Sequence, residues 1–506
     1  MSTEPARRRW WALTALSLAV LLVAVDGTVL SLAIPSIVTD LAPSAGQILW
    51  IGDIYAFVLA GLLVTMGSLG DRYGRKLMLL LGGTAFALLS IPAALADSAG
   101  QLILLRALLG VAGAALMPAT LGLLRTTFSD PRERTFAVGV WSAASAAGAA
   151  AGPLVGGVLL TRYGWGSVFL LNVPVMALVL LIGVPSLRES KDPRPGPFDP
   201  LSALLSLAGI LALIYALKGI VTGDSVLAMV PLAGLAVLLL MWFVRRQLAL
   251  PEPMIDMRLF RNGPFAGAVV AMVLAVFGLS GSIFFFSQYL QFVVGLSPLR
   301  AGLFELPATL AAVAGSLFAG RMMRQAGRGP ATAGALLAIA AGMAAVAALL
   351  DHPSMLLFAL PLMLIGAGDG IAIAVTSDTV LAVSPRDRVG AASAVSETGY
   401  QLGSALGIAL LGSVLTAIYQ AQVGGRIDGV SPAALEAARQ SPGTAAEAVR
   451  GLPAEPAAAL LAAVTDAFGQ ALSATVLLGA AILVFGAALS WWLLPRHGSE
   501  VAEFRG

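Results

Sequence analysis

Fourteen long apolar stretches divide this chain, and they constrain its fold more than any other feature of the sequence. Each is close to the roughly 20 apolar residues that an α-helix needs to cross a bilayer. Hydrophobic residues make up 58% of the 506 residues and charged residues only 11%, against roughly 25% in a soluble domain. The sequence therefore predicts an all-α integral membrane protein. The stretches lie at about 11–35, 48–70, 77–96, 101–124, 135–160, 165–185, 199–221, 225–246, 264–291, 299–320, 331–350, 354–380, 388–419 and 468–494.

The distribution of Lys and Arg gives the predicted topology. Of the 30 basic residues, 23 fall in the two tails or in loops that an even number of spans places on the same side as the tails, and 7 fall elsewhere. The positive-inside rule assigns that side to the cytoplasm. The abundance of Ala, Gly and Arg indicates a bacterial source. We therefore expect fourteen spans in the cytoplasmic (inner) membrane of a bacterium, with both termini in the cytoplasm.

The composition also excludes several kinds of chemistry. There is no cysteine and only two histidines, His352 and His497, so disulfides, thiol chemistry and a His/Cys metal site are excluded. The formal net charge is only +3 and the basic residues are scattered over short loops, which argues against a nucleic-acid partner. No Gly-x-x-x-x-Gly-Lys-Ser/Thr loop for ATP occurs. We expect no cofactor, no resident metal and no enzymatic activity.

The two ends of the chain resemble each other in sequence. A shift of 253 residues places three residues on identical ones: Gly67, Gly74 and Arg75 on Gly320, Gly327 and Arg328. Each set lies at the same end of the second span of its half, and Asp71 falls on Arg324. Such internal repeats are typical of secondary transporters, so the pattern favours a carrier over a channel.

The repeat predicts a domain organisation. We expect two six-helix halves, 1–190 and 263–506, with a linker and two extra spans at 191–262. A polar stretch at 420–466 separates the last two spans on the outer side. Its Ala, Glu and Pro content predicts either short amphipathic helices or disorder.

Several motifs together resemble a known family. The main four are Gly67-Ser-Leu-Gly-Asp-Arg-Tyr-Gly-Arg-Lys76, Val25-Asp-Gly-Thr-Val-Leu-Ser-Leu-Ala-Ile-Pro35, Arg106-Ala-Leu-Leu-Gly-Val-Ala-Gly113 and Gly148-Ala-Ala-Ala-Gly-Pro-Leu-Val-Gly-Gly157. The first resembles the loop signature of the major facilitator superfamily. The second and fourth, with the segments Leu49–Tyr55 and Ser393–Tyr400, are similar to its fourteen-span drug:proton antiporters, the QacA-like multidrug exporters.

The resemblance implies a function. It predicts proton-coupled export of hydrophobic, often cationic drugs or dyes, such as quaternary ammonium or ethidium-like compounds, by alternating access in a monomer. The partners would be the drug, protons and the lipid bilayer. An exporter dedicated to one natural product, such as an antibiotic, is the alternative.

Six of the ionisable side chains inside predicted spans are functional candidates: Asp26, Asp53, Arg106, Glu305, Asp369 and Glu397. Each costs about 2.5 to 3.5 kcal/mol at a helix centre, so we expect them to face a shared aqueous cavity. Burial disfavours the charged form of a carboxylate, which lets it alternate between protonated and charged states. We predict that these residues couple protons or bind cations, with Arg106 tuning a neighbouring acid. Glu305 and Asp369 depart from the family pattern and would be extra cation sites.

An alternative role stays open for these residues. Asp26 and Arg106 would otherwise be polar packing contacts between helices. Asp53 would be a solvated carboxylate at the outer end of its span, and Glu305 would pair with Arg300 near the surface. Outside this set, Asp378 at the inner end of the twelfth span is predicted to cap a helix.

Two glycine-containing motifs are predicted conformational gates: Gly67, Gly70, Asp71, Gly74 and Arg75 in the first, and Gly152, Pro153 and Gly156 in the second. We expect the first to form a tight turn at the cytoplasmic surface, with Asp71 docked on the N-terminus of a helix in the other half near Val389. In the second, small residues let a neighbouring helix approach and Pro153 permits a bend. The alternatives are a purely topological role for the first and ordinary packing for the second.

Three tyrosines are candidates for lining the substrate path: Tyr55, Tyr289 and Tyr400. Their rings could stack on planar aromatic cations. The alternative is packing or lipid contact.

Overall fold

The protein is described by a computed structural model. It covers residues 6–43, 45–192, 199–222, 226–251, 253–255, 257–296, 298–350, 354–384, 389–423, 430–440 and 452–495, together with 442, 445, 448 and 449. Within these residues the chain forms helices and connecting segments, with no strand. Thirteen of the described helices are long and apolar enough to cross a membrane. The expected span at 199–221 corresponds to the helix Pro200–Thr222, whose segment Pro200–Ala216 is apolar.

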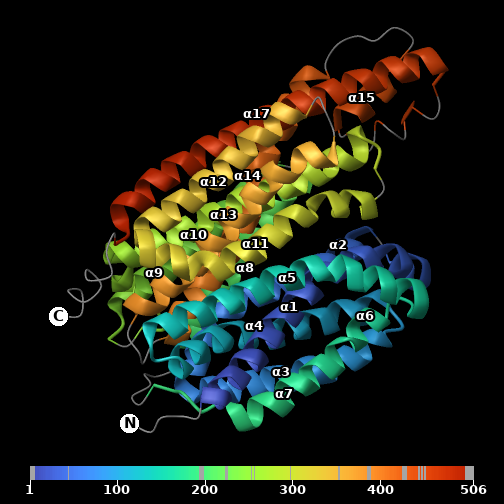
Figure 1. Cartoon of the computed structure of the whole chain (residues 1–506). Helices are drawn as coiled ribbons and strands as arrows, with labels where there is room; N and C mark the ends of the chain where they lie inside the picture. Colours follow the sequence, from blue (N-terminus) through green and yellow to red (C-terminus); the bar gives the residue numbers. More distant parts are fainter. Residues whose placement is uncertain are drawn as a thin grey trace.

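The helices form an N-terminal group, a central pair and a C-terminal group (Figure 1). The N-terminal group comprises α1 (Ala6–Leu41), α2 (Ala45–Tyr73), α3 (Arg75–Ala94), α4 (Ala99–Thr127), α5 (Pro131–Tyr163), α6 (Ser167–Leu170) and α7 (Asn172–Ser186). The central pair is α8 (Pro200–Thr222) and α9 (Val226–Ala249), followed by a 3₁₀ turn, η1 (Met257–Arg261). The C-terminal group comprises α10 (Gly263–Gln288), a π-helical turn η2 (Tyr289–Val293), α11 (Pro298–Ala326), α12 (Arg328–Leu349), α13 (Met355–Val383), α14 (Val389–Gln422), α15 (Pro432–Gln440) and α17 (Ala454–Leu493).

Two of the expected spans differ in detail from the helices that form. The stretch predicted at 165–185 forms one candidate span, Ser167–Ser186, in which only Leu171 separates α6 from α7. Pro174 occupies the first turn of α7, where its missing N–H costs no helical hydrogen bond. The last span begins at Ala454 instead of near 468, so α17 extends into the polar stretch expected at 420–466. The same stretch also contains the short helix α15.

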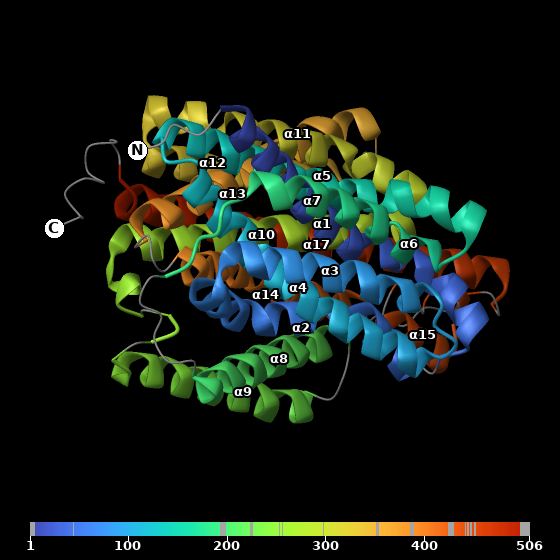
Figure 2. The ribbon, with the colours of Figure 1, turned by 90° about the horizontal axis from the view of Figure 1, so that it is seen from below.

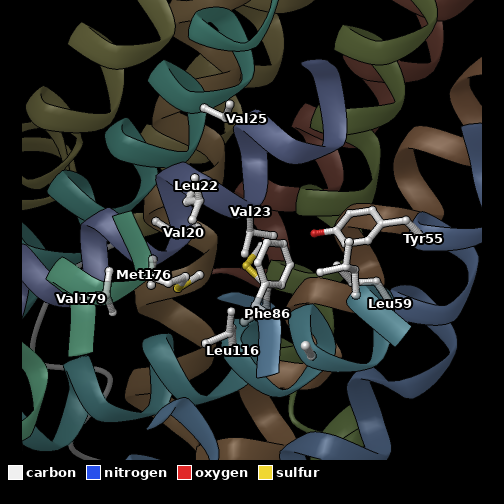
Figure 3. Close-up of a cluster of buried hydrophobic side chains, with 14 of the residues drawn as sticks. Val20, Leu22, Val23, Val25, Tyr55, Leu59, Phe86, Leu116, Met176 and Val179 are labelled. Carbon is white, nitrogen blue, oxygen red and sulfur yellow. The ribbon is translucent and has the colours of Figure 1, made fainter. Parts of the chain in front are cut away.

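Each large group of helices has its own apolar core. One cluster of buried side chains draws on residues between Ala12 and Leu187, with Leu381 the one addition from α13. A second cluster lies between Ala271 and Ala487. Figure 3 shows the first cluster, where side chains of α1, α2, α3, α4 and α7 converge around Val23 and Phe86.

Polar contacts place the start of α1 and the end of α17 at one end of the bundle. Arg9 in α1 pairs with Glu133 at the start of α5, and the backbone N–H of Gly329 donates to the carbonyl of Pro495, just after α17. Arg134 and Arg328, the neighbours of Glu133 and Gly329, both pair with Asp378. We call this the terminal end of the bundle.

The central pair lies on the outside of the bundle, beside α2 (Figure 2). α8 contacts both α2 and α14, and so touches a helix of each large group. Trp50 of α2 stacks on Tyr215 of α8, with ring centroids 6.0 Å apart. At the other end of α8, Leu205 joins an apolar cluster that includes Val64 of α2 and Val395 of α14.

An ion pair holds α8 and α9 together. Arg246 of α9 donates two hydrogen bonds to the carboxylate of Asp199, of 2.8 and 3.1 Å. The same carboxylate accepts from the backbone N–H of Leu201 and from the hydroxyl of Ser202, so Asp199 caps the start of α8. Asp199 precedes the apolar helix, and the Arg246 guanidinium lowers the pKa of its carboxyl to about 2.

We expect Asp199→Asn to lower the thermal unfolding temperature of the purified protein at pH 7. The pKa of Asp199 in the folded protein lies below the ordinary value of about 3.9, so its contribution to stability is complete above about pH 4 and is lost as the pH falls toward 2. The difference in unfolding temperature between wild type and variant should therefore be the same at pH 7 and pH 5. Arg246→Gln should give a similar loss. Equal unfolding temperatures for wild type and both variants would show that the pair contributes nothing.

Candidate functional site

A buried ion pair lies in the core of the N-terminal group. The guanidinium of Arg106 in α4 donates to Oδ2 of Asp26 in α1 over 3.0 Å, and both side chains are 1% exposed. Oδ1 of the same carboxylate accepts a 3.0 Å hydrogen bond from the Asn172 amide of α7. Arg106 thus lies beside an acid, as the sequence predicts. The acid is Asp26, from a helix far away in the chain.

The glycines that follow Arg106 bring α4 close to α2. A Cβ on Gly110 would lie 2.7 Å from the backbone carbonyl oxygen of Tyr55, so only glycine fits there. This close approach sets the Arg106 guanidinium over the ring of Tyr55, with its central carbon 4.7 Å from the ring centroid, a cation–π contact. Tyr55 is buried, and its hydroxyl has no hydrogen-bond partner among the described residues.

Three further candidates lie in the C-terminal group. Glu397 on α14 is within electrostatic range of Tyr55. Tyr400, one turn further along α14, is within electrostatic range of Glu397 and of Asp369 on α13. Asp369 is buried, and its Oδ1 has no hydrogen-bond partner in the described part of the chain. The structure therefore brings Asp26, Arg106, Tyr55 and Glu397 into one electrostatic cluster, with Tyr400 and Asp369 continuing it into the C-terminal group.

Of the other two predicted ionisable residues, Glu305 lies apart from this cluster, and the side chain of Asp53 is outside the described residues. Glu305 on α11 is half-buried and lies beside Ser287. It forms no ion pair with Arg300, which is described and exposed, so the surface pair considered as its alternative does not form. The backbone of Asp53 belongs to α2, but its side chain lies outside the described residues, as does that of Pro153 in α5. Their roles stay predictions.

Of the three tyrosines, Tyr289 has the clearest packing contacts. It is buried, its ring stacks on Phe286, and its hydroxyl donates to the carbonyl of Leu350. This arrangement ties η2 to the end of α12 and favours the packing alternative. Tyr55 and Tyr400 lie at the charged cluster.

The first gate motif, for which a tight turn is expected, is helical except at Gly74. α2 continues through Gly67, Gly70 and Asp71 to Tyr73, and α3 begins at Arg75, so Gly74 alone separates the two helices. Its φ of 126° is open to glycine and strained for other residues. A Cβ there would also lie 2.4 Å from the carboxyl carbon of Glu189. The charged residues of the motif are therefore part of the two helices, and helical hydrogen bonds satisfy their backbone groups up to the break at Gly74.

Asp71 and Arg75 form a buried pair across this break. Nε of Arg75 donates to Asp71 over 2.9 Å, and its NH1 group donates to Ser190 over 2.6 Å. The backbone carbonyl of Asp71 accepts from the N–H of Asp192. The motif is therefore packed on the segment that follows α7. The side chain of Val389 is outside the described residues, and the docking of Asp71 near it stays a prediction.

The second gate motif faces α1. A Cβ on Gly152 would lie 2.0 Å from the hydroxyl of Thr28, and one on Gly148 would lie 2.4 Å from the carbonyl of Leu21. These glycines let α5 pack closely on α1, the helix that carries Asp26. Gly156 is buried on the same helix.

Asp378 has a different role from the one that the sequence predicts. The expectation of a helix cap is wrong, since the carboxylate is fully buried and pairs with Arg134 of α5 at 3.1 Å and with Arg328 of α12 at 2.7 Å. It therefore links the N-terminal and C-terminal groups at the terminal end. The internal repeat in the sequence indicates that Arg328 needs such a contact. Arg75 has Asp71 four residues before it, but Arg328 has Arg324 in that place, so it requires an acid from elsewhere.

A second contact joins the same two groups nearby. Arg125 at the end of α4 donates to the carbonyl of Ser384, just after α13, over 2.7 Å. Between α5 and α11, a Cβ on Gly320 would lie 2.9 Å from a side-chain atom of Thr135. The terminal end is thus closed by ionic, polar and packing contacts between the groups.

These features define a class of protein. Many membrane-spanning helices with ionisable side chains buried between them are characteristic of multi-pass transporters. The chain belongs to the Major Facilitator Superfamily, whose family model matches residues 16–408. It is therefore a transporter, in agreement with the resemblance of its motifs.

Similar proteins agree in length as well as in sequence. The chain is 41% identical to the multidrug efflux pump LfrA of Mycolicibacterium smegmatis over 492 residues, which cover 96% of this chain and 97% of that protein. It is 37% identical to the methyl viologen resistance protein SmvA of Salmonella typhimurium, covering 97% and 99%. The fold resembles the crystal structure of the human organic anion transporter MFSD10 (TETRAN), with a TM-score of 0.64, 16% identity and coverage of 95% and 100%.

Proposed function

We propose that this chain is a fourteen-span, proton-coupled exporter of hydrophobic, often cationic drugs and dyes, of the QacA-like kind. The names of two full-length relatives, a multidrug efflux pump and a methyl viologen resistance protein, support export of drugs. The two separate apolar cores support two six-helix halves, 1–190 and 263–506, with α8 and α9 inserted at 191–262. The terminal end faces the cytoplasm of a bacterial cell, and the carrier works as a monomer in the inner membrane.

The observation that carries this proposal is the buried Asp26–Arg106 pair beside Tyr55 and Glu397. While Asp26 is ionised the pair is neutral, and Glu397 and Asp369 supply the negative charge that attracts a cationic drug. A proton that enters from outside neutralises Asp26 and leaves Arg106 with an uncompensated positive charge above Tyr55. That charge repels the bound cation, because Coulomb interactions are strong where water is scarce. Each charge that crosses a potential of 100 mV contributes about 2.3 kcal/mol.

Alternating access requires that the cytoplasmic end open and close. The contacts of Asp378 with Arg134 and Arg328 close it in this structure. We therefore assign the outward-facing arrangement to this structure, with the two gate motifs stabilising the helix contacts that must change. Asp53 and Glu305 would be further cation or proton sites along the path.

Everted membrane vesicles test the proposal. A drug exporter oriented as in the cell moves its substrate into such vesicles, so an imposed pH gradient, acid inside, should drive uptake of ethidium. Dissipating the gradient with an uncoupler should remove the uptake, and vesicles without the protein give the baseline. Ethidium uptake that persists with the uncoupler would overturn proton coupling. Resistance to one antibiotic without ethidium uptake would favour a dedicated natural-product exporter.

A further inference from the structure

Asn172 is a buried polar side chain that belongs to none of the family motifs. It is the first residue of α7 and is 1% exposed. Its amide nitrogen lies 3.0 Å from Oδ1 of Asp26 and 3.1 Å from the hydroxyl oxygen of Ser90 in α3. Three helices thus meet at one amide group.

The hydrogen-bond pattern fixes which way the amide points. An ionised carboxylate only accepts hydrogen bonds, and Ser90 already donates its hydroxyl hydrogen to the carbonyl of Phe86 over 2.7 Å. Both neighbours therefore need a donor from Asn172. Only the amide nitrogen has two hydrogens to give, so a flipped amide, with its oxygen in this place, would leave both contacts repulsive.

The Asp26 carboxylate is consequently held on both sides. Arg106 donates to Oδ2 and Asn172 donates to Oδ1. The other helices around this point supply Tyr55 from α2, and α5 presents glycines to the same stretch of α1. α6 contains no ionisable residue. Each of these two hydrogen bonds stabilises the ionised carboxylate and so opposes the binding of a proton to Asp26.

We propose that Asn172 is a positioning residue, which orients the Asp26 carboxylate and sets the pH at which it accepts the transported proton. This inference rests on the proposed function, because it assumes that Asp26 carries that proton. Arg106 holds Oδ2 with a charged donor, whereas Asn172 holds Oδ1 with a neutral one. Losing the Asn172 donor would destabilise the ionised form of Asp26 and so raise the affinity of its carboxylate for the proton. The contact with Ser90 keeps the amide in place.

The test is the pH dependence of ethidium transport by the full-length protein in everted vesicles. Asn172→Leu has a similar volume and no donor, so the midpoint of the pH profile should move up by about one unit, a tenfold gain in proton affinity. Asn172→Asp fits the same space but sets a second carboxylate against Asp26, so its midpoint should move further in the same direction. As a matched control, Thr120→Val removes a buried hydrogen bond from Trp141 in the same group of helices. It should lower the amount of folded protein and leave the midpoint unchanged.

The outcomes separate this inference from the proposed function. If Asp26→Asn keeps pH-driven transport, the proposed role of Asp26 is wrong. If Asp26→Asn abolishes it while Asn172→Leu and Asn172→Asp keep the wild-type midpoint, Asn172 is a structural residue only and the inference fails. If Asn172→Leu does not fold, the isosteric Asn172→Asp alone decides by its midpoint.

Discussion

Asp26→Asn should abolish ethidium accumulation driven by a pH gradient, reducing it to the level of vesicles without the protein. An amide cannot bind the proton that drives transport, so binding of the drug and uptake of the proton are no longer linked. The substitution also removes the charge that neutralises Arg106, whose side chain is 1% exposed. Breaking a buried pair from one side costs about 3 to 5 kcal/mol, so a lower yield of folded protein is expected as well.

A double variant separates loss of coupling from loss of the fold. Asp26→Asn combined with Arg106→Gln removes both charges, and such a replacement costs far less stability than removing one of them. The double variant should be recovered in larger amounts than Asp26→Asn, bind ethidium, and still fail to accumulate it against a gradient. Uphill accumulation by either variant would rule out Asp26 as the proton carrier.

Asp378→Asn should open the terminal end of the bundle. It leaves the partly buried guanidinium groups of Arg134 and Arg328 close together without the acid that separates them, and hydrogen bonds to charged groups contribute about 1.5 to 3 kcal/mol each. A loss at the low end of this range shifts the population of the closed state about tenfold. Efflux should fall, because the carrier no longer closes toward the cytoplasm while the drug leaves outside.

The absence of native cysteines makes this shift measurable by cross-linking. A Cβ on Gly320 would lie 3.9 Å from the Cβ of Thr135, within the range of disulfides. Thr135→Cys with Gly320→Cys should therefore cross-link rapidly on mild oxidation and block transport until reduced. Adding Asp378→Asn should slow the cross-link about tenfold. Arg9→Gln breaks an ion pair at the same end but within the N-terminal group, so it should leave the rate unchanged. An unchanged rate with Asp378→Asn would refute the closing role.

The spans can be predicted from the sequence because charged residues are nearly excluded from lipid, which leaves long apolar stretches. The few charged residues inside those stretches are conspicuous for the same reason. The long apolar stretches correspond to helices, and Asp26 and Arg106 stand out as charges that need partners. The span expected at 165–185 forms as Ser167–Ser186, with a one-residue interruption at Leu171. The tight turn expected over the first gate motif is confined to Gly74, because a single glycine suffices to turn the chain.

Only the tertiary structure decided which side chains meet. Asn172 and Asp26 are 146 positions apart, and Arg134 and Asp378 are 244 apart. In a membrane helix most faces are apolar, so hydrophobic periodicity says little about which face meets which neighbour. The sequence by itself therefore determined a multi-pass carrier with buried charges. The packing of the helices decided that Asn172 holds the Asp26 carboxylate and that Asp378 joins the two groups, because those contacts depend on close approach between helices that are distant in the chain.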